Sequence, residues 1–156
     1  PYFTEVMTGF EYCVAVHLAQ EGLRREAVRV VRDVRARYDG EKRNPFDEAE
    51  CGHHYARALA SWGLVPALSG FFYSGLTGEM RFAAPRRRAR WPWAAGSAWG
   101  TVELGRTRRG VRAWLRVGGG RLRLRALAVG ESRVMFSRTK TLAPGAAVSV
   151  EISPAA

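Results

Sequence analysis

One stretch of the chain, from Arg43 to Arg57, is dense in side chains that can do chemistry and reads RNPFDEAECGHHYAR. Its Glu48 can accept hydrogen bonds from two adjacent hydroxyl groups, and its Arg57 can donate through a planar guanidinium. A carboxylate and a guanidinium of this kind suit a sugar. The alternative is that Glu48 only complements the N-terminus of the helix that follows it, and spacing alone favours neither interpretation.

A second such stretch, EVMTGFEY at residues 5–12, stands ahead of another predicted helix. Hydrophobic periodicity predicts three helices: one between Thr8 and Gly22, one at 23–38 and one at 53–68, where Pro66 should kink or end it. The first and third are apolar on nearly every side, which is typical of buried helices, whereas the second is amphipathic and should lie on a surface.

The predicted order is therefore a buried helix, a surface helix and a buried helix. A double layer of helices, as in an (α/α) barrel, requires this alternation. Because the inner helices of such a barrel run parallel, residues 5–12 and 43–57 would meet at the same mouth, where loops on a rigid scaffold hold a ligand.

The second half of the chain changes to a period of two residues. Short predicted strands are separated by Gly, Pro and Ser, and Arg alternates strictly with Leu or Ala over residues 121–127. Gly118–Gly120 is predicted to form a hairpin turn between two strands. The predicted fold class is α+β, with helices over 1–75 and a small, basic, antiparallel β-module over 76–156.

Charge divides the chain in the same way. Residues 1–79 hold 9 basic and 11 acidic side chains, whereas residues 80–156 hold 16 basic and 3 acidic ones. The run RRRARWPW at 86–93 sets arginines beside aromatic rings, as nucleic-acid grooves do. Because 23 of the 25 basic residues are Arg, a compositional bias also explains the run, and we expect a solvated linker there.

The chain resembles glycoside hydrolase family 116, the non-lysosomal glucosylceramidases and microbial β-glucosidases. The resemblance lies in four segments and is dense over residues 1–72: residues 5–12, EGL at 21–23, VRDVRARYDG at 31–40, and RNPFDEAECGHHYARALASW at 43–62. It is looser at WAAGSAWGT, residues 93–101, and thin afterwards.

This resemblance implies a retaining β-glucosidase in which the present chain forms the last helices of a catalytic (α/α)6 domain. The glutamate nucleophile and the aspartate acid/base of the family lie upstream of the matched part, so no catalytic residue is expected in this chain. The resemblance implies that Glu48 and Arg57 bind glucose hydroxyls and that Glu5 lines the same pocket. Met7 stands where the family usually has Trp, which changes the packing against the sugar or the aglycone.

We expect His54 to orient the loop carboxylates. Cys51, His53 and His54 form a cluster of possible metal ligands, and His17 is the one further candidate elsewhere in the sequence. This set lacks the second ligand pair of a zinc site, so we expect neither a metal nor another cofactor. The expected partners are a β-glucoside or glucosylceramide-like substrate and a missing N-terminal part of the same polypeptide, without which the fragment should be inactive.

Under this hypothesis, nucleic acid is not an expected partner. The alternative hypothesis is that the chain is a basic β-rich module that binds nucleic acid or an anionic surface and has no enzymatic activity. No run of about 18 apolar residues is present to cross a membrane, and Cys13 and Cys51 make no disulfide framework. We therefore expect a cytoplasmic protein, with peripheral contact with an anionic membrane as a further option.

Overall fold

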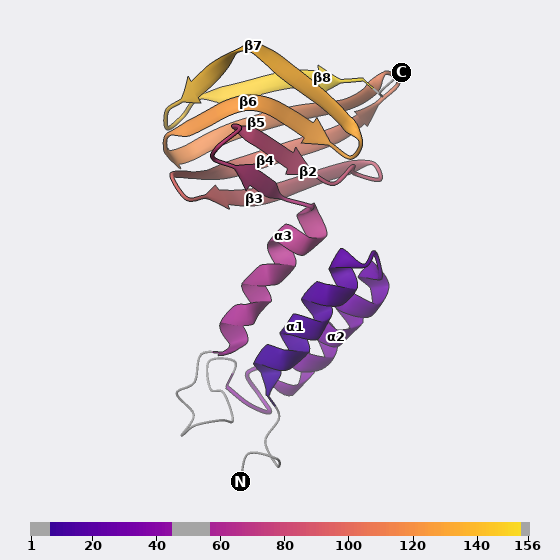
Figure 1. Ribbon diagram of the computed structural model, residues 1–156. Coiled ribbons are helices and arrows are strands. Elements are labelled where there is room, and N and C mark those ends of the chain that lie inside the picture. Colours follow the sequence, from indigo (N-terminus) through magenta and orange to yellow (C-terminus); the bar gives the residue numbers. More distant parts are fainter. Residues whose placement is uncertain (1–6, 45–56, 154–156) are drawn as a thin grey trace. The chain divides into compact units, whose positions relative to one another are not determined.

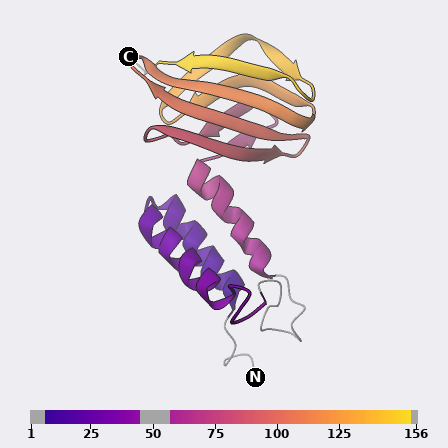
Figure 2. The same ribbon diagram turned by 180° about the vertical axis from the view of Figure 1, so that it is seen from behind.

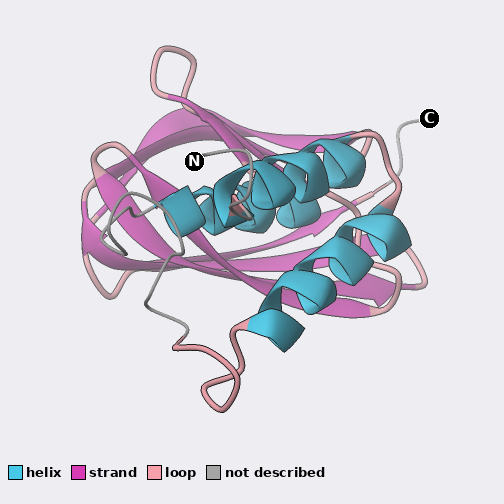
Figure 3. Cartoon of the chain, turned by 90° about the horizontal axis from the view of Figure 1, so that it is seen from below, coloured by secondary structure: helices cyan, strands magenta, loops and turns pink. Residues whose placement is uncertain are grey.

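A computed structural model describes residues 7–44 and 57–153, with only the backbone for Arg57 and Ala58. The chain forms two compact units, Pro1–Leu68 (unit 1) and Ser69–Ala156 (unit 2). Helices build unit 1 and strands build unit 2 (Figures 1 and 3). None of the described helices is long and apolar enough to cross a membrane.

Unit 1 contains α1 (Thr8–Gln20), α2 (Arg24–Arg37) and a 3-10 helix, η3 (Arg57–Gly63), which continues as α3 (Leu64–Ser69). α1 packs against both α2 and η3. The close approach of α1 and η3 depends on Gly63, because a Cβ there would come within 3.0 Å of Val16 Cγ2. The small core of the unit consists of Tyr12, Ala15, Val34, Tyr38 and Leu64.

In the described part of the chain, α1 and the third helix are buried on only part of their surface, whereas α2 buries Ala27 and Val34 as an amphipathic surface helix does. α1 buries Tyr12, Ala15 and Ala19, while Phe10 and Val14 are more than half exposed. The third helix likewise exposes Trp62 and buries Leu64. A helix that is apolar on all sides has no preferred face, so small residues that allow close packing decide which side is buried.

Unit 2 consists of two four-stranded sheets. Sheet I has the order β1-β2-β6-β7 and sheet II the order β3-β4-β5-β8. The strands are β1 (Phe72–Ser74), β2 (Glu79–Phe82), β3 (Arg88–Ala95), β4 (Ala98–Thr107), β5 (Gly110–Gly120), β6 (Leu122–Val129), β7 (Ser132–Leu142) and β8 (Ala147–Ile152). All neighbouring strands are antiparallel except β2 and β6, which are parallel.

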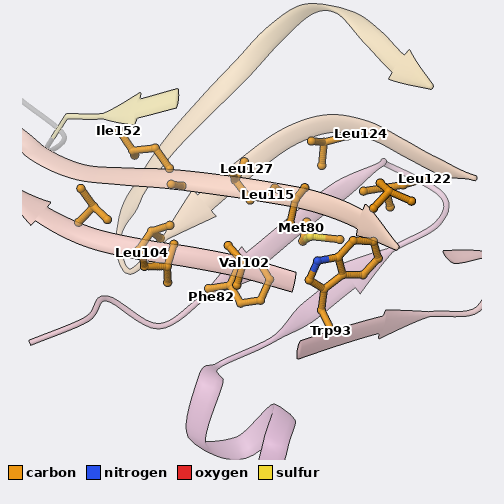
Figure 4. Packing of buried hydrophobic residues seen from close by; sticks show 14 of the residues in the cluster. Met80, Phe82, Trp93, Val102, Leu104, Leu115, Leu122, Leu124, Leu127 and Ile152 are labelled. Carbon is orange, nitrogen blue, oxygen red and sulfur yellow. The ribbon is translucent and has the colours of Figure 1, made fainter. Parts of the chain in front are cut away.

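The core of unit 2 lies where the inner faces of the two sheets meet. Every second residue of β4, β5 and the first part of β6 is buried, including Val102, Leu115 and Leu124 with no exposed surface. Figure 4 shows these side chains converging from both sheets on Met80, Phe82 and Trp93. The period of two that sequence alone shows is therefore the signature of two sheets packed face to face.

The predicted fold class is wrong. The structure has only three short α-helices in its described residues and is predominantly β, which gives no support to the last helices of an (α/α)6 barrel followed by a small antiparallel module. The physical reason is where the apolar surface is buried. The helices share one small cluster, whereas the two sheets bury a cluster three times as large.

Two local predictions in the second half are also wrong. The run at 86–93 is not a linker, because Arg88–Ala95 forms β3, an edge strand in which Pro92 is exposed. Gly118–Gly120 is not a hairpin turn, because β5 ends there in sheet II and β6 begins at Leu122 in sheet I. The glycines therefore mark the crossing from one sheet to the other.

Two glycines of β4 give a matched test of this packing. A Cβ at Gly100 would overlap the carbonyl oxygen of Arg116 and lie 2.7 Å from Trp93 Cζ2, whereas a Cβ at Gly105 would meet nothing within 4 Å. We expect Gly100→Ala to lower the free energy of unfolding by about 1–3 kcal/mol, and Gly105→Ala to leave it unchanged or raise it slightly. Urea unfolding of both variants measures the difference, and equal stability would contradict the described sheet packing.

Candidate functional site

The residues that sequence analysis selects for sugar binding lie mostly outside the described residues. Glu5, Glu48 and His54 belong to the segments 1–6 and 45–56, and Arg57 is the first residue of η3, where only the backbone is described. The structure therefore describes the frame from which these residues extend, and it does not test whether their side chains meet.

An ion pair between Glu11 and Arg37 fixes one end of this frame. Glu11 lies in the first turn of α1 and Arg37 is the last residue of α2, and about a third of each side chain is exposed. The Nη1 atom of Arg37 also donates to the carbonyl oxygen of Asp33, at 3.2 Å. The start of α1 is thus tied to the end of α2, and η3 begins at the same end of unit 1 (Figures 1 and 2).

The turn after α2 leads the chain from this end toward Pro45. Asp39 Oδ1 accepts from the backbone N–H groups of Glu41 (3.1 Å) and Lys42 (2.8 Å), and its Oδ2 lies 2.9 Å from Lys42 Nζ. Gly40 supplies the positive φ of 96° that the turn requires. The turn is therefore held by backbone and side-chain contacts just before the segment that contains Glu48.

Tyr38 and Arg43 close the same turn. The guanidinium carbon of Arg43 lies 5.8 Å from the centre of the Tyr38 ring, at cation–π distance. Tyr38 itself is buried in the core of unit 1. Arg43, the first residue of the motif, is thus anchored to that core.

A groove of about 520 Å³ runs between α1 and η3. Its lining includes Cys13, Val16 and His17 from α1, and Leu59 and Gly63 from η3. His17 and Glu21 lie 3.7 Å apart at its rim, and both are largely exposed to solvent. Among the described residues, the lining of the groove includes none of the predicted sugar-binding residues, and it mixes apolar side chains with Cys13, His17 and Glu21.

In the described part of the chain, no three His, Cys, Asp or Glu side chains are grouped as metal ligands would be. The segment with Cys51, His53 and His54 lies outside that part, so the sequence-based expectation for those three residues is not tested. Cys13 is an exposed free thiol.

Five arginines gather at one end of sheet II, which we call the arginine end: Arg86, Arg87, Arg106, Arg108 and Arg109. The backbone N–H of Arg106 donates to the carbonyl oxygen of Arg87 at 2.8 Å, which sets the segment before β3 against the last residues of β4. The turn between β4 and β5 then carries Arg108 and Arg109. All five are exposed, and none forms an ion pair with a carboxylate of the described residues.

Glu151 is the carboxylate nearest this end. It accepts hydrogen bonds from the Thr107 hydroxyl and from Arg112, and these contacts, that of Thr107 foremost, lower the pKa of Glu151. Glu151 therefore stays charged at neutral pH, where it forms an ion pair with Arg112 and also interacts electrostatically with Arg109 of the arginine end. Sequence analysis did not predict the arginine end, because it did not predict β3. The alternation of Arg88 and Arg90 with Ala89, Trp91 and Trp93 has the period of a strand and could have identified it.

The sequence matches no protein-family model, and comparison with curated proteins finds no relative. The resemblance to glycoside hydrolase family 116 therefore rests on the quoted motif residues alone.

The turn at Asp39 generates a pH prediction. Hydrogen bonds from Lys42, through its backbone N–H and its side chain, lower the pKa of Asp39 from 3.8 to about 2. A lowered pKa in the folded state means that the charged carboxylate stabilises the turn above pH 3.8 and that this contribution disappears as the pH falls toward 2. Carboxyl NMR titration should show Asp39 titrating near pH 2, and Asp39→Asn should loosen the turn at neutral pH. A midpoint near 3.8 would show that the turn does not hold this carboxylate.

Proposed function

We propose that this chain is the C-terminal part of a retaining β-glucosidase of the glucosylceramidase type and that it contributes glucose-binding residues. The proposal assigns hydroxyl binding to Glu48 and Arg57, with Glu5 lining the same pocket and His54 orienting the carboxylates. It assigns no nucleophile or acid/base to the chain, so the fragment alone is expected to be inactive.

The observation that carries the proposal is the meeting of helix starts at one end of unit 1. α1 begins three residues after Glu5, and η3 begins at Arg57, directly after the segment that contains Glu48 and His54. Both helices start at the end of unit 1 where α2 ends, and Glu11 of α1 forms an ion pair with Arg37 of α2 at that end. Two motifs about 40 residues apart in sequence therefore extend from the same end of one small unit.

The surface of unit 1 also supports a larger protein around it. Phe10, Val14, Leu59 and Trp62 are each more than half exposed. Exposed large apolar side chains gathered on a small unit are typical of a site of contact with another protein surface. A preceding domain of the same polypeptide would cover it.

The proposed residues would bind the substrate and stabilise the transition state of the reaction. Retaining glycosidases carry two carboxyl groups about 5 Å apart across the scissile bond, and those groups belong to the preceding part of the enzyme. A carboxylate and a guanidinium on the sugar hydroxyls hold the ring, and hydrogen bonds that strengthen as the ring distorts lower the barrier.

We expect Glu48→Ala and Arg57→Ala in the full-length enzyme each to lower kcat/KM for a β-glucoside by about 100-fold, because each removes a charged hydrogen bond to the substrate. Glu41→Ala and Arg35→Ala remove a carboxylate and a guanidinium that are exposed in the same unit, and they should keep wild-type kinetics. Near-normal turnover in both pocket variants would refute the assignment.

A second candidate function is favoured by the arginine end. Unit 2 holds 16 basic and 4 acidic residues, and the arginine end concentrates five of those charges without ion-pair partners among the described carboxylates. Such a patch attracts polyanions, either nucleic acid or an anionic lipid surface. For a cytoplasmic glucosylceramidase, contact with an anionic membrane would bring the enzyme to a lipid substrate.

This second candidate predicts binding that weakens steeply with salt. Replacing Arg86, Arg87, Arg108 and Arg109 by Gln should reduce the slope of log K against log salt for a single-stranded oligonucleotide by about 3, since each lost phosphate contact contributes about 0.7. The matched control replaces Arg24, Arg25, Arg29 and Arg32 of α2, which are equally exposed. The same loss in both variants would show a non-specific effect of charge.

A further inference from the structure

The outer face of sheet II carries two exposed tryptophans. Trp99 on β4 is 60% exposed and Trp114 on β5 is 37% exposed. The tryptophans of the neighbouring strand β3 behave differently: Trp93 is buried in the core and Trp91 packs against it. Sheet II therefore directs two of its four indoles into the core region and two into solvent (Figure 2 shows this sheet in front).

Trp99 does not project freely, because two glycines form a seat beneath it. A Cβ at Gly118 would come within 2.8 Å of Trp99 Cε3, and one at Gly119 within 2.6 Å of Trp99 Nε1. The indole thus spans both residues, where β5 has an irregularity between its partners Trp99 and Gly100. One side of the ring rests on glycine backbone while much of its surface stays in water, which is the arrangement of a stacking platform.

Polar groups lie between the two indoles. Thr101 stands opposite Arg116, and Glu103 stands opposite Trp114. Glu103 Oε2 accepts a hydrogen bond from Arg88 Nη2 at 2.9 Å, and Glu103 Oε1 lies 3.7 Å from Arg90 Nε. Carboxylate, guanidinium and hydroxyl groups are therefore spaced over the face, and together they can donate to and accept from the hydroxyls of a ligand.

This face carries charges of both signs, with four arginines and two carboxylates. Arg88, Arg90 and Arg112 face Glu103 and Glu151 across ion pairs, which leaves Arg116 as the cation without an ion pair among the described carboxylates. A denser group of arginines without described ion pairs lies at the arginine end. Two fixed carboxylates disfavour a phosphate backbone here, so the face suits a neutral ligand rich in hydroxyl groups.

The distance between the platforms sets the size of that ligand. Trp114 pairs with Glu103, four residues along β4 from Trp99. At about 3.4 Å per residue and 4.8 Å between strands, the two side chains are about 14 Å apart. One monosaccharide cannot reach both, so a ligand that uses the whole face must be an oligomer.

We propose that the outer face of sheet II is a binding surface for neutral oligo- or polysaccharide, with Trp99 and Trp114 as stacking platforms. The negatively polarised face of an indole attracts the C–H groups of a sugar ring, while Glu103, Arg116 and Thr101 bind hydroxyls between the two rings. This surface is separate from the glucose-binding residues of unit 1 and does not depend on the function proposed for them.

The test is affinity electrophoresis of the full chain in gels with soluble β-1,3- or β-1,4-linked glucan, followed by calorimetry with the matching oligosaccharides. Trp99→Ala and Trp114→Ala should each weaken binding by about three- to tenfold. Gly118→Ala keeps all indoles but displaces the Trp99 ring, and it should weaken binding as much as Trp99→Ala. Trp62→Ala, which removes a 70% exposed indole from unit 1, is the matched control and should bind normally.

Circular dichroism and melting temperature establish that each variant is folded. Absence of retardation by every glucan, or equal affinity in the wild type and both sheet variants, would overturn the proposal. So would binding of a single-stranded oligonucleotide that depends on Trp99 in a chain that binds no glucan. Loss of glucan binding in Glu48→Ala or Arg57→Ala but not in Trp99→Ala would place the sugar site in unit 1 and remove this second surface.

Discussion

Each sheet of unit 2 has one face too apolar to remain in water, and the burial of these two faces against each other holds the unit together. β5 and β6 are central to this arrangement. Leu115 on β5 and Leu124 on β6 are both fully buried, although they belong to different sheets. Because side chains alternate across a strand, fixing the inner residues also fixes which residues face outward. The placement of Trp99 and Trp114 on one outer face follows from the burial of Val102 and Leu115 beside them.

Three of the four carboxylates of unit 2, those of Glu79, Glu103 and Glu151, form ion pairs on the sheets. On sheet I, Glu79 lies 2.7 Å from Arg81 and 3.7 Å from Arg133. On sheet II, Glu103 forms ion pairs with Arg88 and Arg90, and Glu151 forms one with Arg112. Five of the arginines outside these pairs gather at the segment before β3, the end of β4 and the turn between β4 and β5, and others, such as Arg116 and Arg123, lie along the strands. A net charge of +11 for the whole chain therefore describes neither the face of mixed charge nor the strongly basic end.

The sequence predicted strands where residue types that favour strands also alternated with a period of two. It failed where residue types and period pointed to different structures. The alternation at 121–127 identified β6 because Leu122 and Leu124 point to one side and Arg123 to the other. β3 was missed because Arg and Pro are rare in strands, although an edge position tolerates both. The helices were located in sequence, but the order of a buried, a surface and a buried helix led to the barrel, which the structure does not support. The seat of Trp99 could not be predicted, because Gly118 and Gly119 meet it only through pairing with a strand about 20 residues earlier.

The parallel pairing of β2 with β6 has a consequence for the order in which the chain folds. The hairpins β3–β4 and β4–β5 join strands that are adjacent in sequence, so they can form as soon as those strands exist. β2 has a different requirement, because Met80 pairs with Leu127, and 46 residues separate them. Long-range pairing of this kind requires a large loop to close first and is intrinsically slow. During synthesis, β2 must therefore wait for β6, with the β1–β2 hairpin exposed while β3, β4 and β5 pair, and sheet II is complete only when β8 follows.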